Sequence, residues 1–174
     1  MRKYVFVAAF IAMLMAAACV RDLVRTPAVP PSLPQADLIV VEKAAHRMMV
    51  FRQGRVQQVY TVALGRGGTG PKTISGDNKV PEGAYRIVGR NPRSAFHLSL
   101  RIGYPTRAQA QDALRKGVDP GGDVMIHGIR KGLGWVGSLQ NTVDWTRGCI
   151  AVTNSEIEEV WRNVPDGTRI IIKP

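Results

Sequence analysis

One histidine and one cysteine in this chain stand in a glycine-rich frame that could support nucleophilic catalysis. His127 follows a short apolar run and precedes Gly128, which predicts a buried strand that ends at the imidazole. Cys149 follows Gly148 and leads into the apolar residues 150–152, so we expect the thiol where a loop enters a second strand. A thiolate is a better nucleophile than a thiol, and a nearby imidazole can lower the pKa of a thiol by forming an ion pair. The pair therefore indicates acyl transfer through a cysteine.

Gly148 predicts where the negative charge of such a reaction would be stabilised. A glycine lets the backbone approach a substrate closely, and the N–H groups of Gly148 and Cys149 would be free to point at a developing oxyanion. Each reactive residue has a simpler interpretation, because a lone cysteine in an apolar strand is usually a core residue and a lone histidine is usually structural. Their occurrence together in one glycine frame favours chemistry.

The order and spacing of these residues resemble the signature of the L,D-transpeptidase (YkuD) family. His127-Gly128 is followed, after seventeen residues, by Thr146-Arg147-Gly148-Cys149, which is similar to the family's HG pair and its Ser/Thr-x-Gly-Cys box. Residues 80–87 also resemble the family's upstream T-P-x-G-x-[FY]-x-I segment, with valine in place of threonine. The resemblance spans roughly residues 37–174, the whole of the expected domain.

Two positions depart from the family pattern. Arg147 stands where histidine is common, and Ala151 stands where many members have arginine. If the family's arginine helps to hold a substrate carboxylate, Arg147 could replace it.

The resemblance implies a peptidoglycan L,D-transpeptidase. Cys149 would attack the carbonyl of the third residue of a tetrapeptide stem, usually diaminopimelate, and expel the terminal D-alanine to leave a thioester. His127, oriented by the main-chain carbonyl of Gly128, would take the thiol proton and later activate the acceptor amine. Asp144 ranks below Gly128 as the group that orients the imidazole. Peptidoglycan stem peptides are the expected partners.

Two other functions remain open at this point. An L,D-carboxypeptidase or amidase-type hydrolase would use the same cysteine with water as the acceptor. A domain that only binds the cell wall would have the fold without the reaction.

Further residues are predicted to bind the substrate beside the reactive pair: Thr146, Arg147, Trp145, Trp135 and His97. Both tryptophans could form walls for a peptide stem, or could belong to the core. His97 alternates with Phe96 and Leu98 in an expected strand over 96–102, so it points away from the core, towards the cleft or towards solvent.

The sequence patterns around these residues predict that a mainly β domain positions them. Apolar and β-branched runs predict about eight strands, beginning with a hairpin that turns at Gln53-Gly54. Capping boxes at Thr106 and Thr153 predict two short helices, the first over residues 107–116. The glycine cluster at 65–70 is interpreted as a flexible surface loop. Together they predict one domain, residues 37–174, with an L,D-transpeptidase-like β-sandwich or barrel.

The N-terminus is predicted to direct export. Residues 1–18 combine a basic start with an apolar stretch too short for a comfortable membrane span, which is typical of a signal peptide. Residues 19–36 are a proline-rich linker. Cys19 follows three alanines and resembles the cysteine of a lipobox, so the stretch is compatible with lipid attachment at Cys19, with simple secretion or with an uncleaved anchor. We expect the periplasm or cell envelope as the location.

The net charge of +11 indicates an anionic partner. The basic residues are scattered and no nucleic-acid module is present, which argues against nucleic acid and leaves carboxylate-bearing wall peptides, or solubility alone. The three histidines are dispersed without metal-ligand spacing, so we expect neither a metal nor another cofactor.

Overall fold

The structure is a computed structural model that describes residues 35–174. The predicted signal peptide, Cys19 and nearly all of the predicted linker lie outside the described residues. Within the described part, none of the helices has the length and apolar character needed to cross a membrane. The described residues include the whole of the predicted catalytic domain.

Eight strands form one sheet, which confirms the predicted mainly β fold. Their order across the sheet is β3-β2-β1-β8-β4-β5-β6-β7. The hairpin between β2 and β3 turns at Gln53 and Gly54, both with positive φ as this kind of tight turn requires. In chain order the strands are β1 (Leu38–Glu42), β2 (Arg47–Arg52), β3 (Arg55–Thr61), β4 (Gly83–Asn91), β5 (Ser99–Ile102), β6 (Met125–His127), β7 (Ile150–Ala151) and β8 (Arg169–Lys173).

The sheet curls so that the segment just after β3, at one edge, pairs with β7 at the other edge. Ala63, just after β3, exchanges two backbone hydrogen bonds of 3.0 and 2.8 Å with Ala151 of β7. A second bridge pairs Gly65 with Thr146. This closure agrees with the predicted sandwich or barrel, and it places the segment after β3 against the loop that carries Cys149.

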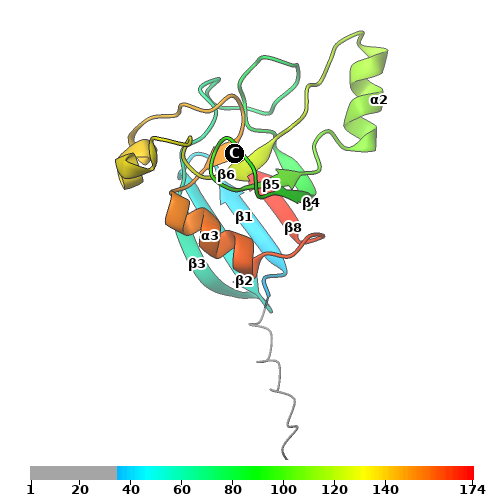
Figure 1. The fold of residues 1–174 in the computed structure, drawn as a ribbon. Helices are drawn as coiled ribbons and strands as arrows, with labels where there is room; N and C mark the ends of the chain where they lie inside the picture. The colour runs from blue at the N-terminus through cyan, green and yellow to red at the C-terminus, as the bar shows by residue number, and fades with distance from the viewer. Residues whose placement is uncertain (1–34) are drawn as a thin grey trace, which may run out of the picture. The chain divides into compact units, whose positions relative to one another are not determined.

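The core is built from the strands and from one face of α3 (Asn154–Asn163). Ile157 and Val160 of α3 are fully buried, and Val160 lies near Val50 and Tyr60 of the β2–β3 hairpin. Figure 1 shows α3 lying across these strands, and its Glu159 accepts a hydrogen bond from Gln58 of β3. Burial of each such aliphatic side chain contributes about 1.5–3 kcal/mol, so α3 is held to the sheet chiefly by its apolar stripe.

Both predicted helices are present with their capping boxes. Thr106 caps α2 (Arg107–Arg115) with Gln109, and Thr153 caps α3 with Glu156. A third helix, the 3₁₀ helix η2 (Gly134–Thr142), was not predicted. Its backbone is interrupted at Gly137, whose φ is 55°, so the segment lacks the periodicity of a regular helix.

The predicted strand over residues 96–102 is wrong in its first half. β5 begins only at Ser99, and His97 has a φ of 65°, which no strand accommodates. The alternation that we used to orient His97 therefore does not apply.

Candidate active site

The parallel pairing of β6 and β7 places His127 and Cys149 on one face of the sheet. In the register, Ile126 lies opposite Ile150 and His127 opposite Ala151. Side chains alternate along a strand, so Cys149, two residues before Ala151, shares the face of His127. Both residues line one cavity of about 810 Å³.

His127 is held in a single orientation by its own neighbour. The imidazole is only 4% exposed, and Nδ1 lies 2.7 Å from the carbonyl oxygen of Gly128. A carbonyl can only accept, so Nδ1 carries the hydrogen and Nε2 of the neutral ring keeps its lone pair. Asp144, the lower-ranked candidate, instead pairs with His46 at 3.0 Å and accepts the N–H of Leu64. Gly128 is therefore the orienting group.

Two aromatic rings enclose the imidazole. The ring centroid of Phe96 lies 4.6 Å from that of His127, and the centroid of Trp145 lies 5.6 Å away. The indole of Trp145 is fixed in turn by its N–H donated to Gln140, at 2.9 Å. Burial lowers the pKa of His127 below its ordinary value, although the bond to Gly128 opposes this shift. The resting imidazole is therefore neutral near pH 7.

Cys149 rests as a thiol. Its Sγ lies 3.7 Å from the carbonyl oxygen of Asp123, to which the S–H donates, and burial raises the pKa of the thiol. In the described residues no hydrogen bond joins this thiol to the imidazole of His127. Both pKa shifts favour the uncharged pair, so transfer of the thiol proton has to accompany attack on a substrate.

The amide groups that we expected to be free are already bonded. The hydroxyl of Thr146 accepts the N–H of Gly148 at 3.2 Å and that of Cys149 at 3.0 Å, and donates to the carbonyl of Cys149 at 2.7 Å. Thr146 is only 3% exposed. The expectation of free N–H groups is wrong because threonine hydroxyls readily satisfy backbone groups two or three residues ahead in a tight turn.

Gly148 is required by the loop that covers it. Its φ is 109°, and a Cβ at this position would lie 2.7 Å from the carbonyl oxygen of Lys79. Gly65 is similarly crowded, since its Cβ would lie 2.0 Å from the carbonyl oxygen of Asn78 and 2.9 Å from Cα of Gly148. The loop over residues 65–80 therefore packs directly on the turn that presents the thiol.

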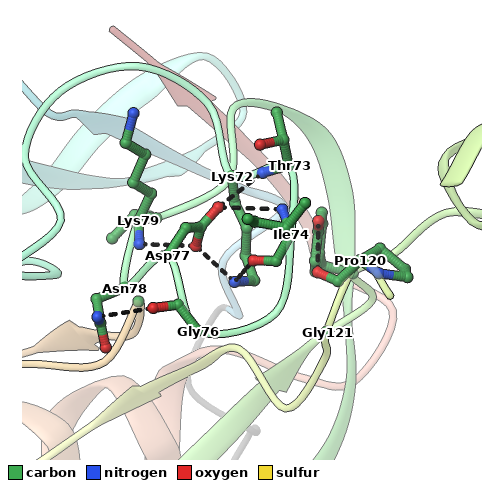
Figure 2. A network of polar contacts seen from close by, with 12 residues as sticks. Lys72, Thr73, Ile74, Gly76, Asp77, Asn78, Lys79, Pro120 and Gly121 are labelled. Atoms are coloured by element: carbon green, nitrogen blue, oxygen red, sulfur yellow. Dashed lines mark hydrogen bonds and ion pairs between the residues drawn. The ribbon is translucent and has the colours of Figure 1, made fainter. Parts of the chain in front are cut away.

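Figure 2 shows how Asp77 fixes this loop from within. Its carboxylate accepts hydrogen bonds from Lys72 Nζ at 2.7 Å and from the backbone N–H groups of Thr73, Ile74 and Lys79. Burial opposes ionisation of Asp77, but these hydrogen bonds outweigh burial and lower its pKa to about 2. The segment that continues the glycine cluster, from Lys72 to Lys79, is thus held together by hydrogen bonds to one carboxylate.

The predicted substrate residues divide into two groups. Trp145, Thr146 and Arg147 line the cavity, with Arg147 exposed. Trp135 is 80% exposed and does not line it. His97 does not line it either, because its imidazole turns to Glu158 of α3, at 2.7 Å. We therefore withdraw Trp135 and His97 from the candidate substrate residues.

An apolar wall of the cavity was missed by sequence reasoning. The η2 segment and its flanks supply Leu133, Val136, Leu139 and Val143, with Leu139 67% exposed. Arg130 and Asp123 add opposite charges to the lining. The apolar residues scattered between the two signature motifs were the available signal in the sequence. Among the described residues there is no group of three or more His, Cys, Asp or Glu side chains placed to hold a metal ion.

Comparisons with known proteins agree with this fold. A sequence model of the L,D-transpeptidase catalytic domain, YkuD, matches residues 36–172. YqjB of Bacillus subtilis (strain 168), named as a candidate L,D-transpeptidase, is 29% identical over 143 residues, which are 80% of this chain and 73% of YqjB.

Two solved structures are similar at low sequence identity. Pgp2, the helical cell shape determining protein from Campylobacter jejuni, has a TM-score of 0.60 at 22% identity, with 79% of this chain and 47% of the Pgp2 chain covered. The L,D-transpeptidase from Xylanimonas cellulosilytica DSM 15894 has a TM-score of 0.54 at 16% identity, with 82% and 63% covered. The chain thus spans less than two thirds of either protein, and the similarity establishes the shared fold.

Proposed function

This chain belongs to the L,D-transpeptidase (YkuD) catalytic domain family, and from that premise we propose that it is a cysteine-dependent peptidoglycan L,D-transpeptidase. One observation carries the proposal. His127, held by Gly128 with its Nε2 lone pair unused, lines the same cavity as the thiol of Cys149. A buried base and a nucleophile in one cavity are the minimum that acyl transfer requires.

In the first half-reaction, Cys149 Sγ attacks the carbonyl carbon of diaminopimelate in a tetrapeptide stem. The Sγ proton passes to Nε2 of His127, the C–S bond forms, and the carbonyl electron pair moves onto oxygen. When that pair returns, the C–N bond to the terminal D-alanine breaks, and its nitrogen takes the proton from Nε2. The products are a thioester on Cys149 and free D-alanine.

In the second half-reaction, an acceptor amine attacks the thioester. Its nitrogen gives a proton to Nε2 of His127, the C–S bond breaks, and the sulfur of Cys149 recovers the proton. With water in place of the amine the same steps give hydrolysis, so the mass of the product distinguishes transfer from trimming.

Thr146 sets a condition on how the oxyanion is stabilised. The N–H groups of Gly148 and Cys149 can serve as oxyanion donors only after the Thr146 hydroxyl releases them. Arg147 is exposed at the cavity and is the proposed partner of a substrate carboxylate. Trp145 forms a wall that both encloses His127 and faces the substrate.

Release of D-alanine tests the proposal directly. Purified full-length protein is incubated with tetrapeptide muropeptides, and free D-alanine and product masses are measured. We expect release by the unaltered protein, none by Cys149→Ala, and a rate about 10²–10⁴-fold lower for His127→Gln. His46→Gln is the matched control, because His46 lies outside the cavity and should keep the rate. Full activity in Cys149→Ala would refute the assigned nucleophile.

We also propose that the protein is exported, with residues 1–18 as signal peptide and residues 19–36 as linker. The basic and apolar pattern of the N-terminus and the wall substrate support this location. Lipid attachment at Cys19 is tested by labelling cells with a tagged fatty acid and comparing the unaltered protein with Cys19→Ala. Membrane attachment that survives this substitution would exclude lipidation of Cys19 as its cause.

A further inference from the structure

A second, smaller cavity adjoins the candidate active site. It has a volume of about 260 Å³ and shares Asn91 and Met125 with the larger cavity, so these two residues stand between the cavities. Ser99 and Arg101 of β5 also line it. The register of β5 with β6 pairs Ser99 with His127 and Arg101 with Met125. The second cavity therefore opens on the sheet face that carries the reactive pair.

Ser99 is the one buried side chain in the described residues whose polar atom has no hydrogen-bond partner. It is 1% exposed and lines the second cavity. Buried hydroxyl groups are almost always bonded, because an unpaired one loses its hydration without compensation. Its unused hydrogen is available to a ligand that enters the cavity.

Arg101 supplies a positive charge to the same cavity. Its guanidinium pairs with the carboxylate of Asp123 at 3.1 Å, and both side chains are more than half exposed, which makes the pair weak and exchangeable. Arg90 also lines the cavity, but its guanidinium already serves carbonyl groups of Trp161 and Val164 and the carboxylate of Asp166. Arg101 is therefore the cation that a ligand would meet.

Asn91 adds a third donor. Its side-chain oxygen accepts the N–H of Arg93 at 2.9 Å, which leaves the amide NH₂ to donate elsewhere. Arginine, a hydroxyl and a primary amide are all donors, and no acidic residue lines this cavity. This donor set matches a carboxylate, which accepts several hydrogen bonds and pairs well with a guanidinium.

From this donor set we infer that the second cavity binds the side-chain carboxylate of the diaminopimelate residue whose carbonyl is attacked, an inference that rests on the proposed function. The register of β6 and β7, continued by one residue, places Cys149 beside Met125, which in turn lies beside Arg101. Two strand spacings are about 10 Å. The two carboxyl carbons of diaminopimelate are roughly six bonds of about 1.5 Å apart, so an extended side chain and one hydrogen bond of about 3 Å cover this separation.

The carboxylate of Asp123 forms an ion pair with the guanidinium of Arg101 when no substrate is present. A substrate carboxylate takes its place on the guanidinium, because two carboxylates compete for one cation. The displaced residue is the same one whose carbonyl oxygen accepts the thiol hydrogen of Cys149. Asp123 thus contacts both the arginine that recognises the substrate side chain and the thiol that attacks its carbonyl.

The experiment measures binding in the absence of turnover. Full-length Cys149→Ala protein is titrated with two tetrapeptide stems, one with diaminopimelate and one with lysine, which keeps the side-chain amine but lacks the carboxylate. We expect the diaminopimelate stem to bind about tenfold more tightly, as one charge-assisted hydrogen bond would provide. Adding Arg101→Gln should remove this preference, and adding Arg55→Gln, which removes a positive charge remote from both cavities, should keep it.

Two further variants separate recognition from folding. Asp123→Asn removes the competing carboxylate and should tighten binding of the diaminopimelate stem several-fold, without an equal effect on the lysine stem. Ser99→Ala should weaken the preference and at the same time raise the melting temperature, because it removes an unpaired buried hydroxyl. A substitution that only disturbed packing would not combine these two effects.

The possible results distinguish the two proposals. An unchanged preference in Arg101→Gln, or equal affinity for both stems in the parent protein, overturns the carboxylate site and leaves the proposed function standing. If neither stem binds and the unaltered protein releases no D-alanine, the proposed function fails and this inference fails with it.

Discussion

His127 donates its Nδ1 hydrogen to the carbonyl oxygen of Gly128, its immediate neighbour in the chain, at 2.7 Å. The bond needs no third side chain, unlike a triad whose orienting carboxylate comes from elsewhere in the fold. Asp144 is consequently left to a structural role with His46 and Leu64. The tautomer of the proposed base is fixed by local backbone geometry.

We predict that Gly128→Ala disrupts this geometry. A Cβ at residue 128 would lie 2.8 Å from Asn154 Oδ1 and 2.9 Å from Ile157 Cγ2, so either α3 or the Gly128 carbonyl must move. Overpacking of this kind costs about 1–3 kcal/mol, and displacement of the carbonyl should lower kcat as well. Gly122→Ala is the matched control, because its Cβ would meet nothing within 4 Å. Urea unfolding and D-alanine release measure the two effects, and equal behaviour of both variants would contradict the prediction.

The pH dependence of kcat/KM should show a broad plateau. Burial lowers the pKa of His127 below 6.5 and raises the pKa of Cys149 above 9.0. The neutral base is needed for attack, so activity rises with pH through a pKa below 6.5 and stays level until the thiol ionises above 9.0. A coupled assay of D-alanine release across this range checks the profile. An acid limb above pH 6.5 would contradict the lowered pKa of His127.

The same two shifts should narrow the pH range of stability. The folded state disfavours protonated His127, so its contribution to the free energy of unfolding is present above pH 6.5 and is lost as the pH falls below that value. The folded state also holds the Cys149 proton more tightly, so stability is lost as the pH rises above 9.0. The difference in urea midpoint between the unaltered protein and Cys149→Ala should be constant at lower pH and should change only above pH 9.0.

Thr146→Val should destabilise the turn that presents the nucleophile. The substitution keeps the shape of the side chain but leaves the N–H groups of Gly148 and Cys149 without their acceptor, at a cost of about 1–3 kcal/mol. Thr146→Ser retains the hydroxyl and should cost less than half as much. Urea unfolding compares the two variants, and the prediction is wrong if valine and serine are equally stable.

Asp77→Asn should loosen the loop over residues 65–80. The amide cannot replace the ion pair with Lys72, whose ammonium would then be buried without a countercharge, at a cost of about 3 kcal/mol. Because the Lys79 carbonyl packs on Gly148, kcat/KM should fall together with stability. Asp112→Asn on α2 is the control, since that carboxylate lies on the surface.

The unaltered protein should also lose stability in acid through Asp77. Its pKa of about 2 means that the contribution of this carboxylate to the free energy of unfolding is present above pH 4 and is lost between pH 4 and 2.

The sequence by itself predicted most of the strands, both α-helices and the candidate reactive pair, although it missed η2 and began β5 too early. Local patterns carried this information, since the Gln53-Gly54 turn, the capping boxes at Thr106 and Thr153, and the motifs around His127 and Cys149 each depend on neighbours in the chain. It also placed the orienting carbonyl at Gly128, through the family resemblance.

Only the tertiary structure decided the surroundings of that pair. The closure of the sheet from Ala63 to Ala151 and the contact of Lys79 with Gly148 join residues more than sixty positions apart, which no local period reports. Thr146 takes the amide hydrogens that the motif suggested were free, and His97 turns to Glu158 because its backbone leaves the strand. Only the assembled fold decides which residues pack together over long range and which hydrogen-bond partners each group obtains. Those two factors determine the protonation states of the reactive pair and the residues that line the candidate site.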